Sequence, residues 1–92
     1  MKHLNVRIFG QVQGVGFRYY AKREADDLNL KGIIKNEKDG SVYIELEGEE
    51  DSIEDFLEWC NDGPELAKVD KIETEESPLK NYSEFLIQWV SF

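Results

Sequence analysis

Three glycines at positions 10, 14 and 16 constrain this chain more than any other feature of its sequence. The stretch 10–18 follows an alternating segment and precedes a helical pattern, which predicts a turn between a strand and a helix start. Glycines let such a turn fold tightly, and the helix start adds unpaired N–H groups and the positive end of a dipole. With the Arg18 guanidinium, these groups favour binding of a small anion, most naturally a phosphoryl group.

The distribution of charge is compatible with such a site, although the formal net charge of the chain is −9. Residues 1–40 carry eight Lys/Arg and five Asp/Glu, whereas residues 41–92 carry three and fifteen. The basic residues therefore accompany the glycine-rich stretch, where the local field can attract an anion. The acidic total argues against nucleic acid as a partner.

The length and composition predict one small domain, residues 1–92, with a single core. No apolar run approaches the roughly 18 residues that a membrane helix needs, so no membrane partner is expected. The N-terminus does not resemble a secretory signal, which favours a cytoplasmic protein. With one His and one Cys, a metal site built on soft ligands is not expected, and a monomer is the default for so charged a small domain.

Hydrophobic periodicity predicts the order βαββαβ, with the last strand split in two. The expected strands cover residues 3–9, 30–36, 41–47, 67–75 and 82–90, and the expected helices cover 17–28 and a segment from 51 or 52 to 62. Either Asp51 or Ser52 is expected to cap the second helix, and Gly63 with Pro64 to end it. Two right-handed crossovers and a central hairpin predict an α+β, ferredoxin-like sandwich, an antiparallel sheet with two helices on one face.

The same patterns predict which side chains are buried. In the strand 41–47, inward and outward positions are expected to alternate, with outward Tyr43, Glu45 and Glu47. Cys60 is expected to be a buried small hydrophobe. Three aromatic residues, Tyr19, Tyr20 and Trp89, are expected to have packing roles. The one histidine, His3, is expected to be solvated.

The predicted topology brings Asn36 to the glycine-rich stretch. The first two strands of a split βαβ unit run the same way, so their carboxyl ends lie at the same edge of the sheet. An Asn amide there can hold a water beside a bound phosphoryl group. Neither Arg18 nor Asn36 is a good general base, so the substrate must hydrolyse easily, as a mixed anhydride of a carboxylic acid and phosphate does.

These motifs resemble those of the acylphosphatase family. The stretch 10–18 is strongly similar to the family signature, and 31–42 is similar to its second motif, a Gly, three residues, an Asn and then Asp-Gly. The segment 63–69 also resembles the family, so the likeness covers nearly the whole chain. The resemblance implies hydrolysis of acyl phosphates to carboxylate and inorganic phosphate, without a cofactor. It also implies that Asn36 orients the attacking water and that the phosphate is bound by Gln13, Gly14, Val15, Gly16, Phe17 and Arg18.

Three classes of function remain open from the sequence: a free-standing acylphosphatase, a binding module that hydrolyses little, and a domain of a larger carbamoyl-transfer maturation protein. The presence of both Arg18 and Asn36 favours an enzyme, and the length of 92 residues disfavours the third class. An RNA-binding module is disfavoured by the acidic balance and by the missing aromatic pattern. The physiological acyl phosphate is left open, with carbamoyl phosphate and 1,3-bisphosphoglycerate among the candidates.

Overall fold

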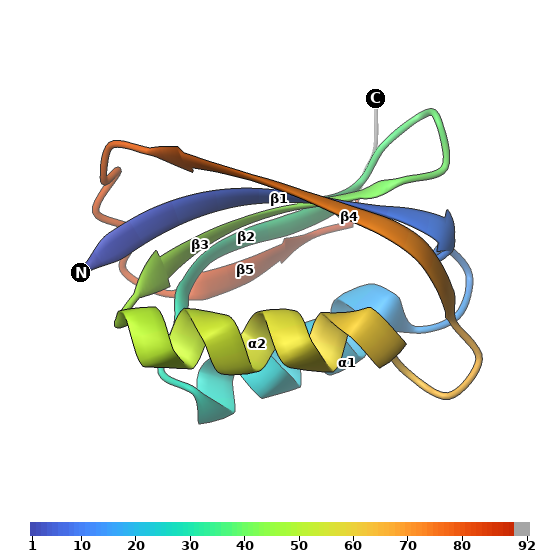
Figure 1. The fold of residues 1–92 in the computed structure, drawn as a ribbon, viewed down its shortest axis with the longest axis horizontal. Coiled ribbons are helices and arrows are strands. Elements are labelled where there is room, and N and C mark those ends of the chain that lie inside the picture. The colour runs from blue at the N-terminus through green and yellow to red at the C-terminus, as the bar shows by residue number, and fades with distance from the viewer. Residues whose placement is uncertain (90–92) are drawn as a thin grey trace.

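A computed structural model describes residues 1–89 and confirms the predicted sandwich. One five-stranded sheet, in the order β4-β1-β3-β2-β5, has both helices on one face (Figure 1). The sheet is antiparallel except for β5, which pairs parallel to β2. The elements are β1 (Lys2–Gln11), α1 (Phe17–Asp27), β2 (Lys31–Asn36), β3 (Val42–Gly48), α2 (Glu50–Asp62), β4 (Lys68–Ser77) and β5 (Phe85–Gln88).

The core lies between the sheet and the helices, where the alternating strands meet the two helical stripes. Cys60 is fully buried there, as predicted. The stripe of α1 contributes Phe17, Ala21 and Ala25, and that of α2 contributes Ile53 and Phe56. No helix within residues 1–89 combines the length and the apolar character needed to cross a bilayer.

Strand polarity places the functional edge of the sheet. Because β3 lies antiparallel to both β1 and β2, these two strands run the same way, as the predicted topology requires. The parallel partner of β2, the edge strand β5, runs in that direction too. The carboxyl ends of β1, β2 and β5 therefore meet at one edge, next to the amino end of α1.

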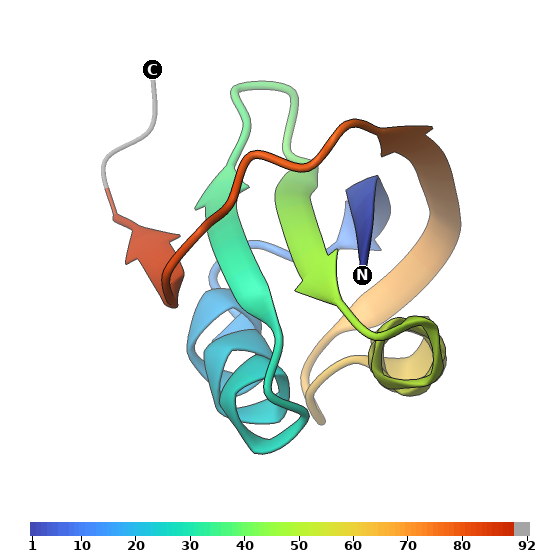
Figure 2. The ribbon, with the colours of Figure 1, turned by 90° about the vertical axis from the view of Figure 1, so that its left-hand side faces the viewer.

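The segment between β4 and β5 changes the predicted burial of the sheet's other face. Residues 78–84, here called the crossing segment, pass over the sheet on the side away from the helices (Figure 2). Beneath this segment, His3, Glu45 and Glu47 are only 1%, 5% and 2% exposed. The prediction that His3 is solvated is therefore wrong. Glu45 and Glu47 lie on the outward face as predicted, but that face is covered, because alternation shows which residues share a face and not what covers it.

Several element boundaries also differ from prediction. The α2 helix begins at Glu50, with Glu49 as its N-cap and no capping hydrogen bond from a side chain, so the prediction of a cap at Asp51 or Ser52 is wrong. Acidic residues in the first turn complement the helix dipole there. The last strand is shorter than predicted, since β5 begins at Phe85 and not at residue 82, and ends at Gln88; Val90 of the predicted strand lies outside the described residues.

Candidate active site

The loop between β1 and α1 forms a cradle of backbone N–H groups. Gly14 and Gly16 have φ angles of 74° and 81°, in the left-handed region that favours glycine. Gly16 is the N-cap of α1 and provides no side-chain cap, and the first turn of the helix holds no acidic residue. The first N–H groups of an α-helix have no acceptor within the helix. They and the helix dipole are therefore available to an anion at this edge.

Arg18, in the first turn of α1, is held against the end of β5. Its Nη1 donates to the carbonyl oxygens of Gln88 and Trp89, at 3.1 and 3.2 Å. Its guanidinium carbon lies 4.9 Å from the centre of the Trp89 ring, a cation–π distance. Among residues 1–89, these contacts occupy one of the three guanidinium nitrogens, so Nε and Nη2 keep the planar pair of donors that suits a phosphoryl group.

Asn36 shares a cavity with Arg18, as the predicted topology requires. The residue is the last of β2, one position beyond the Lys35–Gln88 pair of the parallel ladder. The cavity has a volume of about 210 Å³. Three segments contribute its lining, namely Val12, Gln13, Gly14, Gly16, Phe17, Arg18 and Tyr19 from the loop and α1, Asn36 from β2, and Trp89 after β5.

Gln13 joins the loop to the turn that follows Asn36. Its side-chain amide nitrogen donates to the carbonyl oxygens of Glu37 and Ser41, at 2.8 and 2.9 Å. That turn is closed by Asp39, whose carboxylate accepts from the Ser41 N–H and hydroxyl at 2.9 and 2.6 Å. These bonds hold the pKa of the Asp39 carboxyl below its usual range. The amide donors of the Gln13 side chain thus serve the frame of the cavity.

The family of the chain follows from comparison with known proteins. The family model for acylphosphatase matches residues 4–87. The chain belongs to the acylphosphatase family. It is 43% identical over 89 residues to the acylphosphatase of Thermotoga maritima, covering 97% of this chain and 99% of that one. The crystal structure of acylphosphatase from Bacillus subtilis superimposes with a TM-score of 0.93 at 39% identity, covering 96% of this chain and 99% of that one.

A longer protein contains a similar fold. Full-length HypF, in its phosphate- and nucleotide-bound form, matches with a TM-score of 0.91 and 41% identity. The match covers 98% of this chain but only 12% of HypF. An acylphosphatase-like fold therefore also occurs as a small part of a larger protein.

Two aromatic side chains at the cavity that holds Arg18 and Asn36 are exposed. Tyr19 is 53% exposed and Trp89 is 62% exposed, and both line the cavity. Tyr20 is exposed as well and meets Tyr19 edge to face, with ring centres 5.1 Å apart. The predicted packing roles do not bury these three residues: Tyr19 and Tyr20 contact each other and Trp89 contacts Arg18, all on the surface. Strand and helix periodicity placed them beside buried neighbours, and no signal in the sequence marked the cavity rim.

Two other hollows are larger, and neither is lined by Arg18 or Asn36. One, of about 490 Å³, lies over β1, β3 and β4 on the sheet face away from the helices. The other, of about 470 Å³, lies between the loop and the end of α2, and Gly16 lines both it and the Arg18 cavity. Only the smaller cavity brings together a guanidinium, a side-chain amide and a helix start among the residues that the structure describes.

Proposed function

We propose that Arg18 and the backbone N–H groups of residues 13–18 hold the phosphoryl group of an acyl phosphate, and that Asn36 orients the water that attacks it. The protein is an enzyme of the acylphosphatase kind, which hydrolyses acyl phosphates to carboxylate and inorganic phosphate. One observation carries the assignment of roles: a single cavity is lined by Arg18, by Asn36 and by the start of α1.

The reaction needs little from the protein beyond position and charge. A water oxygen bonds to phosphorus while the bond from phosphorus to the acyl oxygen breaks, and its electron pair leaves on the carboxylate. The protons of the water stay with the phosphate or pass to solvent. Because a carboxylate is a stable leaving group, no strong general base is required.

Arg18 and Asn36 divide the work of positioning. The Nε and Nη2 donors of Arg18, with the loop N–H groups, neutralise the negative charge on the phosphoryl oxygens. The position of that charge changes little as the reaction proceeds. The Asn36 amide can accept from the water and donate to a phosphoryl oxygen at the same time. These two hydrogen bonds would orient the water so that an oxygen lone pair points at phosphorus. Correct orientation of a nucleophile can raise a rate by several orders of magnitude.

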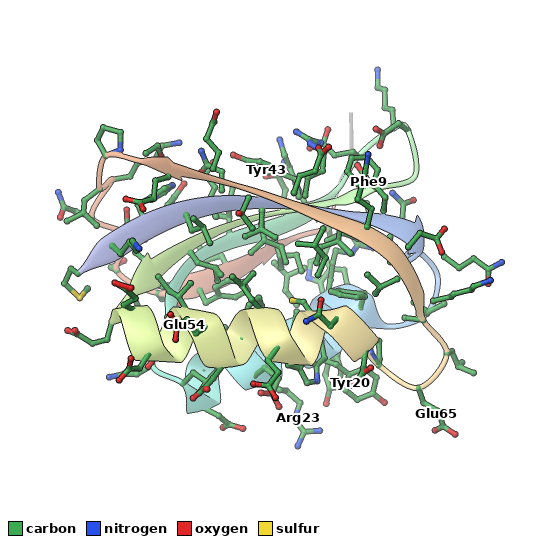
Figure 3. All side chains as sticks on the ribbon, in the orientation of Figure 1. Phe9, Tyr20, Arg23, Tyr43, Glu54 and Glu65 are labelled. Atoms are coloured by element: carbon green, nitrogen blue, oxygen red, sulfur yellow. The ribbon has the colours of Figure 1, made fainter. Side chains whose placement is uncertain are left out.

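The test is hydrolysis of benzoyl phosphate in the presence of a chelator, with wild type beside Arg18→Ala. The matched control is Arg23→Ala, because Arg23 lies on the same helix but is exposed and points away from the sheet (Figure 3). We expect turnover in wild type and in the control, and none above background in Arg18→Ala. A folded wild type without turnover would favour the binding module, and equal turnover in Arg18→Ala would refute the assigned role.

Three further statements about the chain stay predictions. The monomeric state is tested by light scattering on the eluting protein, and the cytoplasmic location by fractionation of the source cells. The single domain spanning residues 1–92 predicts one cooperative unfolding transition.

A further inference from the structure

A buried cluster of charged side chains lies on the sheet face away from the helices, far along the strands from the cavity. His3 of β1 and Glu47 of β3 are direct cross-strand partners, and His3 Nδ1 donates to Glu47 Oε2 at 2.7 Å. His3 Nε2 lies 2.8 Å from Asn5 Oδ1 and 3.3 Å from Glu45 Oε1. Tyr43, on the same face (Figure 3), donates to Glu45 Oε2 at 3.0 Å.

The crossing segment is bonded to both carboxylates of this cluster. Glu47 accepts the backbone N–H of Lys80 at Oε2 and that of Tyr82 at Oε1, the latter at 3.0 Å. Glu45 Oε1 accepts the Tyr82 hydroxyl at 2.8 Å and pairs with Lys80 Nζ at 2.9 Å. Four interactions from two residues of the crossing segment therefore converge on two carboxylates of the central strand β3.

The charge state of the cluster agrees with this arrangement. Burial alone would raise the pKa of Glu47, but the Lys80 N–H, the His3 ring and the Tyr82 N–H outweigh it, and the pKa lies below its usual range. Burial likewise acts to raise the pKa of Glu45, and Lys80, the Tyr82 hydroxyl and the Tyr43 hydroxyl lower it overall. Both side chains are therefore carboxylates near neutral pH, when they accept most strongly.

The crossing segment leads directly into the strand that holds Arg18. The backbone carbonyl oxygen of its last residue, Glu84, accepts the Gly32 N–H at 3.0 Å, and β5 begins at the next residue. The strand has only four residues and, in the part of the chain that the structure describes, its one neighbouring strand is β2, so the sheet ladder supports it on one side. At its far end, the carbonyl oxygens of Gln88, the last residue of β5, and of Trp89, which follows it, accept from Arg18 Nη1.

A shift of β5 along β2 would therefore move the acceptors of Arg18. A register shift of one residue displaces a strand by about 3.3 Å and moves each of its side chains to the other face of the sheet. A displacement of that size is longer than a hydrogen bond, so it would release the guanidinium. Phe85, which is buried, and the four interactions of the crossing segment oppose such a shift at the start of β5.

We infer that Glu47 and Glu45 are positioning residues for Arg18, which act by clamping the crossing segment so that β5 presents its terminal carbonyl oxygens in register. The inference rests on the proposed function, because it takes Arg18 as the group that holds phosphate. A buried charge cluster is a poor way to gain stability alone, since well-packed apolar residues do as well or better. The hydrogen bonds of this cluster are directional, so they select one position of the crossing segment over the sheet.

The experiment compares Glu47→Gln with wild type in two measurements. Hydrogen exchange should become faster at the N–H groups of the crossing segment and of β5, with the central strands unchanged. The Kd of inorganic phosphate, from calorimetry, and the KM for benzoyl phosphate should rise together by about fivefold or more, while kcat stays within about twofold, because uniform binding is lost. The matched control is Glu75→Gln, an exposed carboxylate of β4 outside the cluster, which should match wild type.

A folded Glu47→Gln with an unchanged phosphate Kd would overturn the inference, and so would faster exchange in β5 without any change in KM. If Glu47→Gln does not fold, Tyr82→Phe decides, because it removes the 2.8 Å bond to Glu45 and leaves Glu47 in place. That variant should show the same direction of change, and no change would count against the inference. Failure of the proposed function is distinguishable, because Arg18→Ala would then bind phosphate as wild type does, whatever Glu47→Gln does.

Discussion

Replacing Arg18 with lysine would keep the positive charge at the cavity and remove the planar fork. Arg18 donates from Nη1 to two carbonyl oxygens, at 3.1 and 3.2 Å, and has further donors on Nε and Nη2. A lysine has three N–H bonds on one nitrogen, so satisfying both carbonyl oxygens leaves one donor for phosphate. At least one charge-assisted hydrogen bond is lost, worth about 1.5–3 kcal/mol, which corresponds to roughly a 10- to 150-fold fall in kcat/KM.

The assay for Arg18→Lys is the initial rate of benzoyl phosphate hydrolysis over a range of substrate concentrations, with the melting temperature as a check on folding. Arg23→Lys makes the same change on the exposed side of α1 and should leave kcat/KM unchanged. A kcat/KM within about threefold of wild type in Arg18→Lys would refute the argument, because it would show that a point charge suffices.

Three further outcomes are expected. Asn36→Ala should lower kcat by on the order of 10²-fold or more, the scale of one lost preorganised donor, while phosphate still binds; loss of binding by calorimetry would contradict the water-positioning role. Gln13→Leu should lower the free energy of unfolding by about 1–3 kcal/mol, since it removes two hydrogen bonds to backbone carbonyl oxygens; urea titration measures this, and no change would show that the bonds add nothing. The lowered pKa values of Glu45 and Glu47 add stability that is present above the unfolded carboxyl pKa of about 4.3 and is lost as the pH falls through the folded values. Urea midpoints between pH 6 and pH 3 should therefore fall, and should fall less steeply in Glu47→Gln; parallel slopes would refute this.

The pairing of Arg18 with Asn36 could be predicted because it depends on local chemistry and strand direction. Glycines before a helical pattern predict a turn with free N–H groups, wherever the rest of the chain lies. The polarity of a split βαβ unit then brings the end of the second strand to that turn. Both steps need only short segments and a rule of topology, and the shared cavity agrees with them.

The burial of His3, Glu45 and Glu47 could not be predicted, because it depends on a segment that is irregular and distant in sequence. Alternation in β1 and β3 placed these residues on the face away from the helices, which is normally wet. Only the path of residues 78–84 shows that this face is covered, and that path has no periodic signal. A charged residue on such a face is normally exposed to solvent. Charged residues are buried only where other groups pair with them or bond to them.

The cavity is held from two sides, which gives a physical reason why a loop with two left-handed glycines could serve as a rigid site. Gln13, at the start of the loop, is bonded to the turn after β2, and Arg18, just after the loop, is bonded to Gln88 at the end of β5 and to Trp89, which follows it. These two strands are parallel neighbours, so their ladder sets the distance between the two attachments. The left-handed glycines that shape the loop would otherwise give it more freedom than any other residue type. Anchoring both ends to one pair of strands should remove that freedom before a phosphoryl group binds in the proposed way, which is the condition for electrostatic stabilisation without reorganisation.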